Sequence, residues 1–164
     1  MECRARRSVS EQLRHSTAVF SGEAVAEEYR PIVTPQPGWP EASEILVIKF
    51  SVQRWWKGSG EREVFLYTGV LRRPGGFVIV GEDFRFKVGE QYLVYAFGDV
   101  DNLATTSCER TTQLEKAAED LKALGEGRLP VKKEAPKCSV AAKKALQLTA
   151  RACFSNNFFP SARC

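Results

Sequence analysis

The sequence contains a single histidine, His15, and no cysteine pair at metal-ligand spacing. Structural zinc sites and most catalytic triads need clustered His or Cys side chains, so neither is expected here. The GxSxG, HExxH and P-loop signatures, which mark three large classes of enzyme, are missing as well. We therefore expect neither an enzyme nor a bound cofactor or metal ion.

Long apolar segments are also missing. No run of eighteen apolar residues occurs, so no transmembrane helix is expected. The basic start at residues 1–7 is followed by a polar stretch and not by an apolar segment, so we expect no signal peptide in this chain. From these features alone, the protein is either cytosolic or has lost a leader.

Acidic residues become scarce towards the C-terminus. Residues 128–164 contain eight Lys and Arg residues against one acid, Glu134, whereas the positive net charge of the whole chain is only +4. A Pro- and Lys-rich stretch at 128–137 marks the change. We therefore predict a globular domain over 1–127 and a basic, Cys-containing tail over 128–164 that is partly helical or disordered.

The sequence does contain clear β-strand patterns. Within 44–69, apolar and polar residues alternate on both sides of a Gly-rich turn, which predicts a long hairpin. The adjacent Trp55 and Trp56 break this alternation, because neighbouring side chains of a regular strand point to opposite faces. We expect a bulge or a strand end there, with one ring over the core and the other at the rim. Gly22, in the middle of an earlier strand pattern, predicts a bend or a close approach of two backbones.

The remaining elements follow from the same rules. Helices are predicted over 8–16 and 111–125, the second capped by Thr111 or Thr112 and ended by Gly125. Strands are predicted over 17–29, 77–80, 83–86, 91–97 and 103–108, turns over 71–76 and 87–90, and an exposed Pro-rich loop over 30–40. Five or so strands with helices at both ends imply a mainly β domain, a small antiparallel barrel with helices packed on its outside. Trp39, in the loop, is either a cap over the sheet or a contact residue.

Four segments together resemble the bacterial relatives of tissue inhibitors of metalloproteinases, in the superfamily of netrin-like modules. They are residues 18–25, 50–58, 86–94 and 106–108, in this order and at these spacings. The resemblance covers residues 3 to 125. It implies an OB-like, five-stranded Greek-key barrel with flanking helices, and a secreted or periplasmic protein whose partner is a zinc metalloprotease or another extracellular protein.

In that family the chain begins Cys-x-Cys, and the amine and carbonyl of the first Cys chelate the zinc ion of the target protease. The resemblance assigns the inhibitory edge to Met1, Glu2, Cys3 and Arg4. It also implies a disulfide between Cys3 and Cys108, while the pairing of Cys138, Cys153 and Cys164 stays open. Met1 and Glu2 depart from the family's start, and no cysteine occurs near Gly81, where the family has the partner of its first Cys. We therefore expect a protein-binding module whose inhibitor activity is vestigial or depends on processing, with active inhibition from a processed N-terminus as an alternative.

Nucleic-acid or polyanion binding is a further alternative, because OB barrels stack bases on exposed aromatic rings. The candidate rings are Trp55, Trp56, Tyr67, Tyr92 and Tyr95. Acidic residues interrupt any basic strip beside them, among them Glu61, Glu63 and Glu90. Packing in the core and at the rim is therefore the preferred explanation of these rings, and nucleic acid is an unlikely partner.

Overall fold

The computed structural model of the chain describes residues 7–32, 43–79 and 84–131. The chain divides into two compact units, residues 1–133 and 134–164, and every described residue belongs to the first. Residues 132–164 and the loop that contains Trp39 lie outside the described residues. The predicted character of the tail therefore stays a prediction.

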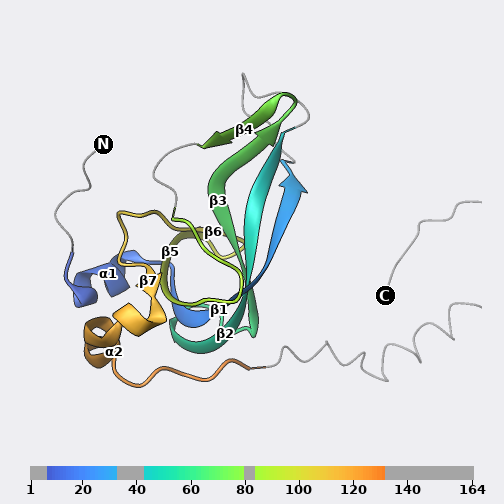
Figure 1. The fold of residues 1–164 in the computed structure, drawn as a ribbon. Coiled ribbons are helices and arrows are strands. Elements are labelled where there is room, and N and C mark those ends of the chain that lie inside the picture. Colours follow the sequence, from blue (N-terminus) through green and yellow to red (C-terminus); the bar gives the residue numbers. More distant parts are fainter. Residues whose placement is uncertain (1–6, 33–42, 80–83, 132–164) are drawn as a thin grey trace, which may run out of the picture. The chain divides into compact units, whose positions relative to one another are not determined.

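The described residues form a mainly β fold, a sheet of several strands with two α-helices, as the sequence predicts (Figure 1). The strands are β1 (Ala18–Pro31), β2 (Glu44–Lys57), β3 (Glu63–Arg73), β4 (Gly76–Ile79), β5 (Gln91–Asp99), β6 (Asn102–Ala104) and β7 (Thr112–Gln113). The helices are α1 (Val9–His15), the short 3-10 helix η1 (Leu114–Lys116) and α2 (Ala118–Leu124). The predicted hairpin over 44–69 is confirmed as β2 and β3.

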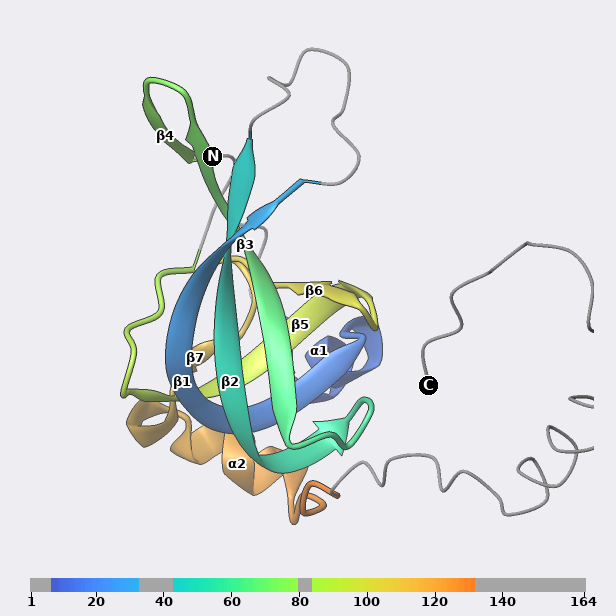
Figure 2. The same cartoon turned by 90° about the vertical axis from the view of Figure 1, so that its right-hand side faces the viewer.

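The sheet closes on itself because β1 pairs with two strands (Figure 2). It pairs antiparallel with β2 along one edge and antiparallel with β5 along the other. From β2 the pairing continues antiparallel to β3, parallel to β6 and antiparallel to β5. The circuit therefore returns to β1, while β4 and β7 are short additions to β3 and β5.

Gly22 lies where β1 bends across β2. A Cβ atom added to Gly22 would lie 2.6 Å from the backbone oxygen of Ser51 and 3.1 Å from the Cα of Val52. The register of the two strands shifts between Ser21 and Gly22. Only glycine fits such a contact between backbones, so the predicted close approach is confirmed.

Alternation along the strands builds two apolar clusters, one on each face of the sheet. The inner cluster holds large rings, including Phe20, Phe50, Trp55, Phe86 and Tyr92. On the other face, Val19, Leu93 and Tyr95 pack with residues of α1, η1 and α2. Because consecutive strand residues point to opposite faces, β1 and β5 each contribute to both clusters, and this joins the helices to the sheet.

The two tryptophans of β2 lie at a bulge, as predicted. Val19 pairs with Lys57 and the next residue, Phe20, pairs with Trp55, so Trp56 is the extra residue on β2. Trp55 is fully buried in the inner cluster, whereas Trp56 is half-buried against the helix-facing cluster. The two adjacent rings therefore lie on opposite faces of the sheet, as consecutive strand residues ordinarily do.

The first predicted helix is confirmed and the second is shorter than predicted. Helix α1 begins with a capping box in which Ser8 and Glu11 exchange hydrogen bonds. Residues 111–117 are not α-helical, because the hydroxyl of Thr111 accepts the backbone N–H of Tyr95 at 3.0 Å and so serves β5. The prediction of a Thr111 or Thr112 cap is wrong, since α2 begins after Ala117 without a side-chain cap. Gly125 ends α2 with φ +70°, as predicted.

Other predicted boundaries are wrong too. The strand predicted over 103–108 is β6, which ends at Ala104. The turn expected over 71–76 is only two residues long, because β3 continues to Arg73 and β4 starts at Gly76. The strand expected over 83–86 is absent from the described residues 84–86, where Phe84 and Phe86 pack on the inner cluster without pairing. Strand β1 extends to Pro31, into the region predicted as a loop.

The ends of β1, β2 and β3, together with β4, extend beyond the closed part of the sheet (Figure 1). We call this extension the wing, and define it as residues 27–31, 44–48, 68–73 and 76–79. Its four strands pair side by side in the order β1, β2, β3, β4. Leu71 in the wing is 1% exposed and pairs with Ile45 on one side and Val78 on the other, which is why β3 does not turn where the sequence predicts.

Candidate protein-binding surfaces

A buried ion pair holds the N-terminal segment at Arg7. The side chains of Arg110 and Asp120 are 10% and 7% exposed, and Nε of Arg110 donates to Oδ2 of Asp120 at 2.8 Å. Nη1 of Arg110 donates to the backbone carbonyl of Arg7 at 3.0 Å. One guanidinium therefore joins the start of the described chain to α2, with its charge balanced inside the protein.

The same carboxylate also accepts a hydrogen bond from Tyr95. The distance from the Tyr95 hydroxyl to Oδ2 of Asp120 is 2.9 Å. Burial raises the pKa of Tyr95 far above its ordinary value, and the hydrogen bond to Asp120 raises the pKa further. The hydrogen bond to Asp120 likewise raises the pKa of Arg110. Both groups therefore keep their protons at every physiological pH, and the cluster of Arg110, Asp120 and Tyr95 is a structural anchor.

Cys108 lies next to this anchor and is disulfide-bonded. Its neighbour Glu109 accepts a hydrogen bond from Gln12 of α1 and forms an ion pair with Arg7 at 3.7 Å. The turn at 106–109 is thereby joined to the segment that leads into α1. The predicted inhibitory residues Met1, Glu2, Cys3 and Arg4 lie outside the described residues, so the Cys3–Cys108 pairing stays a prediction.

The predicted contact aromatics are mostly interior. Trp55 is fully buried and donates from Nε1 to the backbone oxygen of Glu61 at 2.8 Å. Trp56 is half-buried and donates to the backbone oxygen of Gly125 at 2.9 Å. Tyr92 and Tyr95 are buried too. Tyr67 is half-buried, as Trp56 is. The three buried rings offer no stacking platform for bases, which weakens the case for nucleic-acid binding, and Trp39 lies outside the described residues.

Three consecutive exposed apolar side chains lie in the wing. All four residues of β4 are exposed, and the side chains of Phe77, Val78 and Ile79 are 64%, 38% and 55% exposed. The sequence predicts a short strand over 77–80, but none of its residues is among the predicted contact residues. The sequence does contain a signal, because a Pro-Gly-Gly turn followed at once by four apolar residues predicts a hairpin whose second strand is apolar on both faces.

A hollow of about 240 Å³ adjoins this surface. Its lining is mainly apolar and includes Leu46, Ile48, Val70, Ile79, Phe84 and Phe86, with Glu27, Thr68 and Arg85 among them. Ile79 belongs both to the hollow and to the exposed strand, so the two form one continuous apolar surface. Such a hollow is large enough to take one apolar side chain of a partner.

Ring and charge contacts hold the wing in place. The ring of Phe77 lies 6.0 Å from the ring of Tyr29, between their centroids. The guanidinium of Arg72 lies 4.3 Å from the Tyr29 centroid and also pairs with Glu44. These contacts join β1, β2, β3 and β4, so β4 is exposed as part of an ordered sheet.

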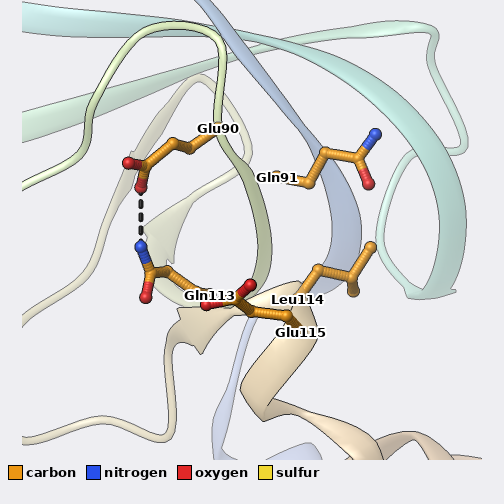
Figure 3. Close-up of a pocket in the computed structure, with 5 residues that line it drawn as sticks. All are labelled: Glu90, Gln91, Gln113, Leu114 and Glu115. Atoms are coloured by element: carbon orange, nitrogen blue, oxygen red, sulfur yellow. Dashed lines mark hydrogen bonds between the residues drawn. The ribbon is translucent and has the colours of Figure 1, made fainter.

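A second hollow, of about 500 Å³, lies where β5 begins beside β7 and η1 (Figure 3). It is lined by Glu90, Gln91, Gln113, Leu114 and Glu115. The Glu90 carboxylate accepts hydrogen bonds from Gln113 at 2.7 Å and from the Tyr92 hydroxyl at 2.8 Å. These two bonds, the one from Gln113 first, lower the pKa of Glu90, so the hollow is anionic at neutral pH. The carboxylate is already satisfied by its neighbours, and we assign no ligand to this hollow.

Within residues 7–32, 43–79 and 84–131, no group of His, Cys, Asp and Glu side chains is arranged to hold a metal ion. In the same ranges, no helix combines the length and the apolar character that crossing a membrane requires. Comparison of the sequence with known protein families gives no match, and comparison with curated proteins gives none either.

Proposed function

We propose that this chain is a protein-binding module and that the wing is its binding surface. One observation carries the proposal, namely that Phe77, Val78 and Ile79 are all exposed on a single ordered strand. Removing apolar surface from water is favourable by about 25 cal/mol per Å², so this strand has free energy to gain from a partner. Contiguous apolar patches on soluble proteins commonly mark sites of protein interaction.

The strand circuit supports an OB-like Greek-key barrel as the frame of this module. Three successive antiparallel strands, β1 to β3, are followed by a parallel pairing of β3 with β6 and by closure of β5 onto β1. An OB-like frame agrees with the resemblance to netrin-like modules. On the basis of this resemblance we also propose that the protein is secreted or periplasmic. In this proposal the inhibitor activity of the family is vestigial.

Inhibition of a zinc endopeptidase by a processed N-terminus is a second candidate. The observation that favours it is the anchor, because Arg110 fixes the backbone of Arg7 beside the turn that carries the disulfide-bonded Cys108. A segment that starts from a fixed point loses less chain entropy when it binds. Glu2 opposes this function, since a carboxylate placed in an apolar specificity pocket would have to be desolvated.

Capture of partners with matched variants tests the first function. The bait is the full chain, compared with the double variant Phe77→Ser/Ile79→Ser and with the control variant Val88→Ser/Val100→Ser. Val88 and Val100 are exposed to a similar extent, at 52% and 67%, but lie outside the wing. We expect a protein that is captured by the parent chain and by the control and lost with the wing variant. Equal capture by all three baits would contradict the proposal.

Titration separates the two candidates. The purified chain, with its N-terminus confirmed by intact mass, is titrated against zinc endopeptidases of the matrix and thermolysin types. We expect weak inhibition or none from the chain that begins at Met1. Stoichiometric inhibition that is unaffected by Phe77→Ser/Ile79→Ser would make the N-terminal edge, and not the wing, the functional surface.

A further inference from the structure

We propose that the partner of the wing supplies an extended strand, which pairs with the free edge of β4 and carries a carboxylate opposite Gly76. This inference rests on the proposed function of the wing and names the kind of partner that the wing takes. Among the described residues β4 pairs with β3 alone. Alternate residues of an edge strand direct their N–H and C=O groups outward, where they can pair with another chain.

The edge of β4 lacks the features that usually block such pairing. Exposed edges are commonly protected by Lys, Pro or a bulge. The sequence of β4, Gly-Phe-Val-Ile, contains no charged residue and no proline, and its register with β3 runs without a shift from Arg73–Gly76 to Val70–Ile79. Strand addition therefore meets no steric or electrostatic obstacle within β4 itself.

The side chains of β4 define what an added strand should carry. Ile79 pairs with Val70, and both line the apolar hollow, while Phe77 lies two residues away on the same face. Val78 points to the other face, where it pairs with Leu71. A strand beside β4 would place successive side chains next to these two faces in turn. The partner strand should therefore be apolar at alternate positions, with one side chain entering the hollow.

Arg73 supplies the charge preference. It pairs with Gly76, and its Nε is buried without a hydrogen-bond partner. The neighbouring Arg72 differs, because Glu44 already neutralises it. Gly76 has no side chain, and among the described residues no heavy atom lies within 4 Å of where its Cβ would be. The space over Gly76 is therefore open towards the next strand position, about 4.8 Å beyond β4. A carboxylate at that position would pair with Arg73.

A second copy of this chain satisfies these requirements less well. In the fully overlapped antiparallel register, self-pairing of β4 opposes Gly76 of one copy to Ile79 of the other. Arg73 would then face an apolar residue and gain no carboxylate. A strand from a different protein, with an acidic residue at this position, is therefore the occupant that the charges favour.

Selection from a display library of random short linear peptides tests the inference, with the full chain as the target and Phe77→Ser/Ile79→Ser as the counter-target. We expect enriched peptides with apolar residues at alternate positions and one acidic residue at the end of this pattern that lies opposite Gly76. Arg73→Gln should weaken their binding roughly fivefold, whereas Arg62→Gln, a change of the same kind outside the wing, should leave it unchanged. N-methylation of the peptide at alternate amides should weaken binding by about tenfold or more, because it removes backbone hydrogen bonds and keeps the side chains.

The outcomes distinguish this inference from the function on which it rests. Enriched peptides that bind equally well after N-methylation would overturn strand pairing and leave the wing as a side-chain docking surface. Failure to enrich any peptide over the counter-target would also overturn it, and the capture experiment would then decide the proposed function separately. A concentration-dependent dimer in sedimentation that is lost with Phe77→Ser/Ile79→Ser would replace the foreign strand by a second copy.

Discussion

The guanidinium of Arg110 and the carboxylate of Asp120 form an ion pair inside the protein, between a loop and α2. The pair has two further contacts. Asp120 accepts a hydrogen bond from the Tyr95 hydroxyl, and Arg110 donates a hydrogen bond to the backbone carbonyl of Arg7. It therefore connects β5, α2 and the start of the described chain. Removal of either charge should affect all three.

We predict that Asp120→Ala lowers the free energy of unfolding by about 3 kcal/mol or more, because it leaves the buried Arg110 charge unpaired. Urea denaturation measures the change. Arg110→Met/Asp120→Leu should recover much of the loss, since it removes both charges.

The matched control is Glu63→Gln, which breaks the ion pair of Lys49 and Glu63 at the surface. The side chains of this pair are 26% and 59% exposed. Glu63→Gln should lower the free energy of unfolding by less than about 1 kcal/mol. An Asp120→Ala variant as stable as this control would show that the pair is not structural.

The raised pKa of Tyr95 determines how the stability of the protein changes at high pH. Its folded-state pKa is raised, first by burial, above the ordinary value of 10.0, which applies in the unfolded chain. Its contribution to stability is therefore fully present below about pH 10 and is lost as the pH rises further, where the unfolded chain releases the proton and the folded chain keeps it. Tyr95→Phe should reduce this loss, measured as the slope of unfolding free energy against pH. Identical slopes for the two proteins above pH 10 would contradict the assignment.

The backbone hydrogen bonds of residues 128–131 determine how far the chain can be shortened from its C-terminus without loss of stability. Arg128 exchanges two backbone hydrogen bonds with Trp55, at 2.7 Å and 2.8 Å, and Val131 donates to Gly60 at 2.8 Å. A chain that ends at Lys133 keeps these bonds, and a chain that ends at Gly127 loses them. At about 1 kcal/mol for each net hydrogen bond, we expect the shorter chain to be less stable by about 2–3 kcal/mol. Equal thermal stability of the two chains would support a boundary at 127/128, as the sequence predicts.

Local rules predict the strands that carry strong alternation and the turns that carry glycine. The hairpin of β2 and β3, the bulge at Trp55 and Trp56, and the close approach at Gly22 all follow from side-chain period and backbone sterics. Each depends on residues that are close in sequence or on one backbone contact. For that reason they can be recognised without the fold.

Tertiary contacts decide the features that the sequence does not predict. The helical pattern of 111–117 is correct as a pattern, but Thr111 is used to satisfy the backbone of Tyr95 in β5. Likewise, β3 passes the expected turn because Leu71 is buried between Ile45 and Val78. The exposed surface of β4 depends on which strand ends at the edge of the sheet, and this is a property of strand order, which local periodicity does not contain.

The most direct test of the account is the dissociation constant for a partner captured by the parent chain, measured for that chain and for two variants. The variants are Phe77→Ser/Ile79→Ser in the wing and Val88→Ser/Val100→Ser outside it, each first shown by thermal unfolding to be folded. We predict that the wing variant binds about thirtyfold more weakly or worse, as expected when apolar anchor residues are removed, and that the control binds like the parent. The same dissociation constant for all three proteins would contradict the claim that the wing binds the partner.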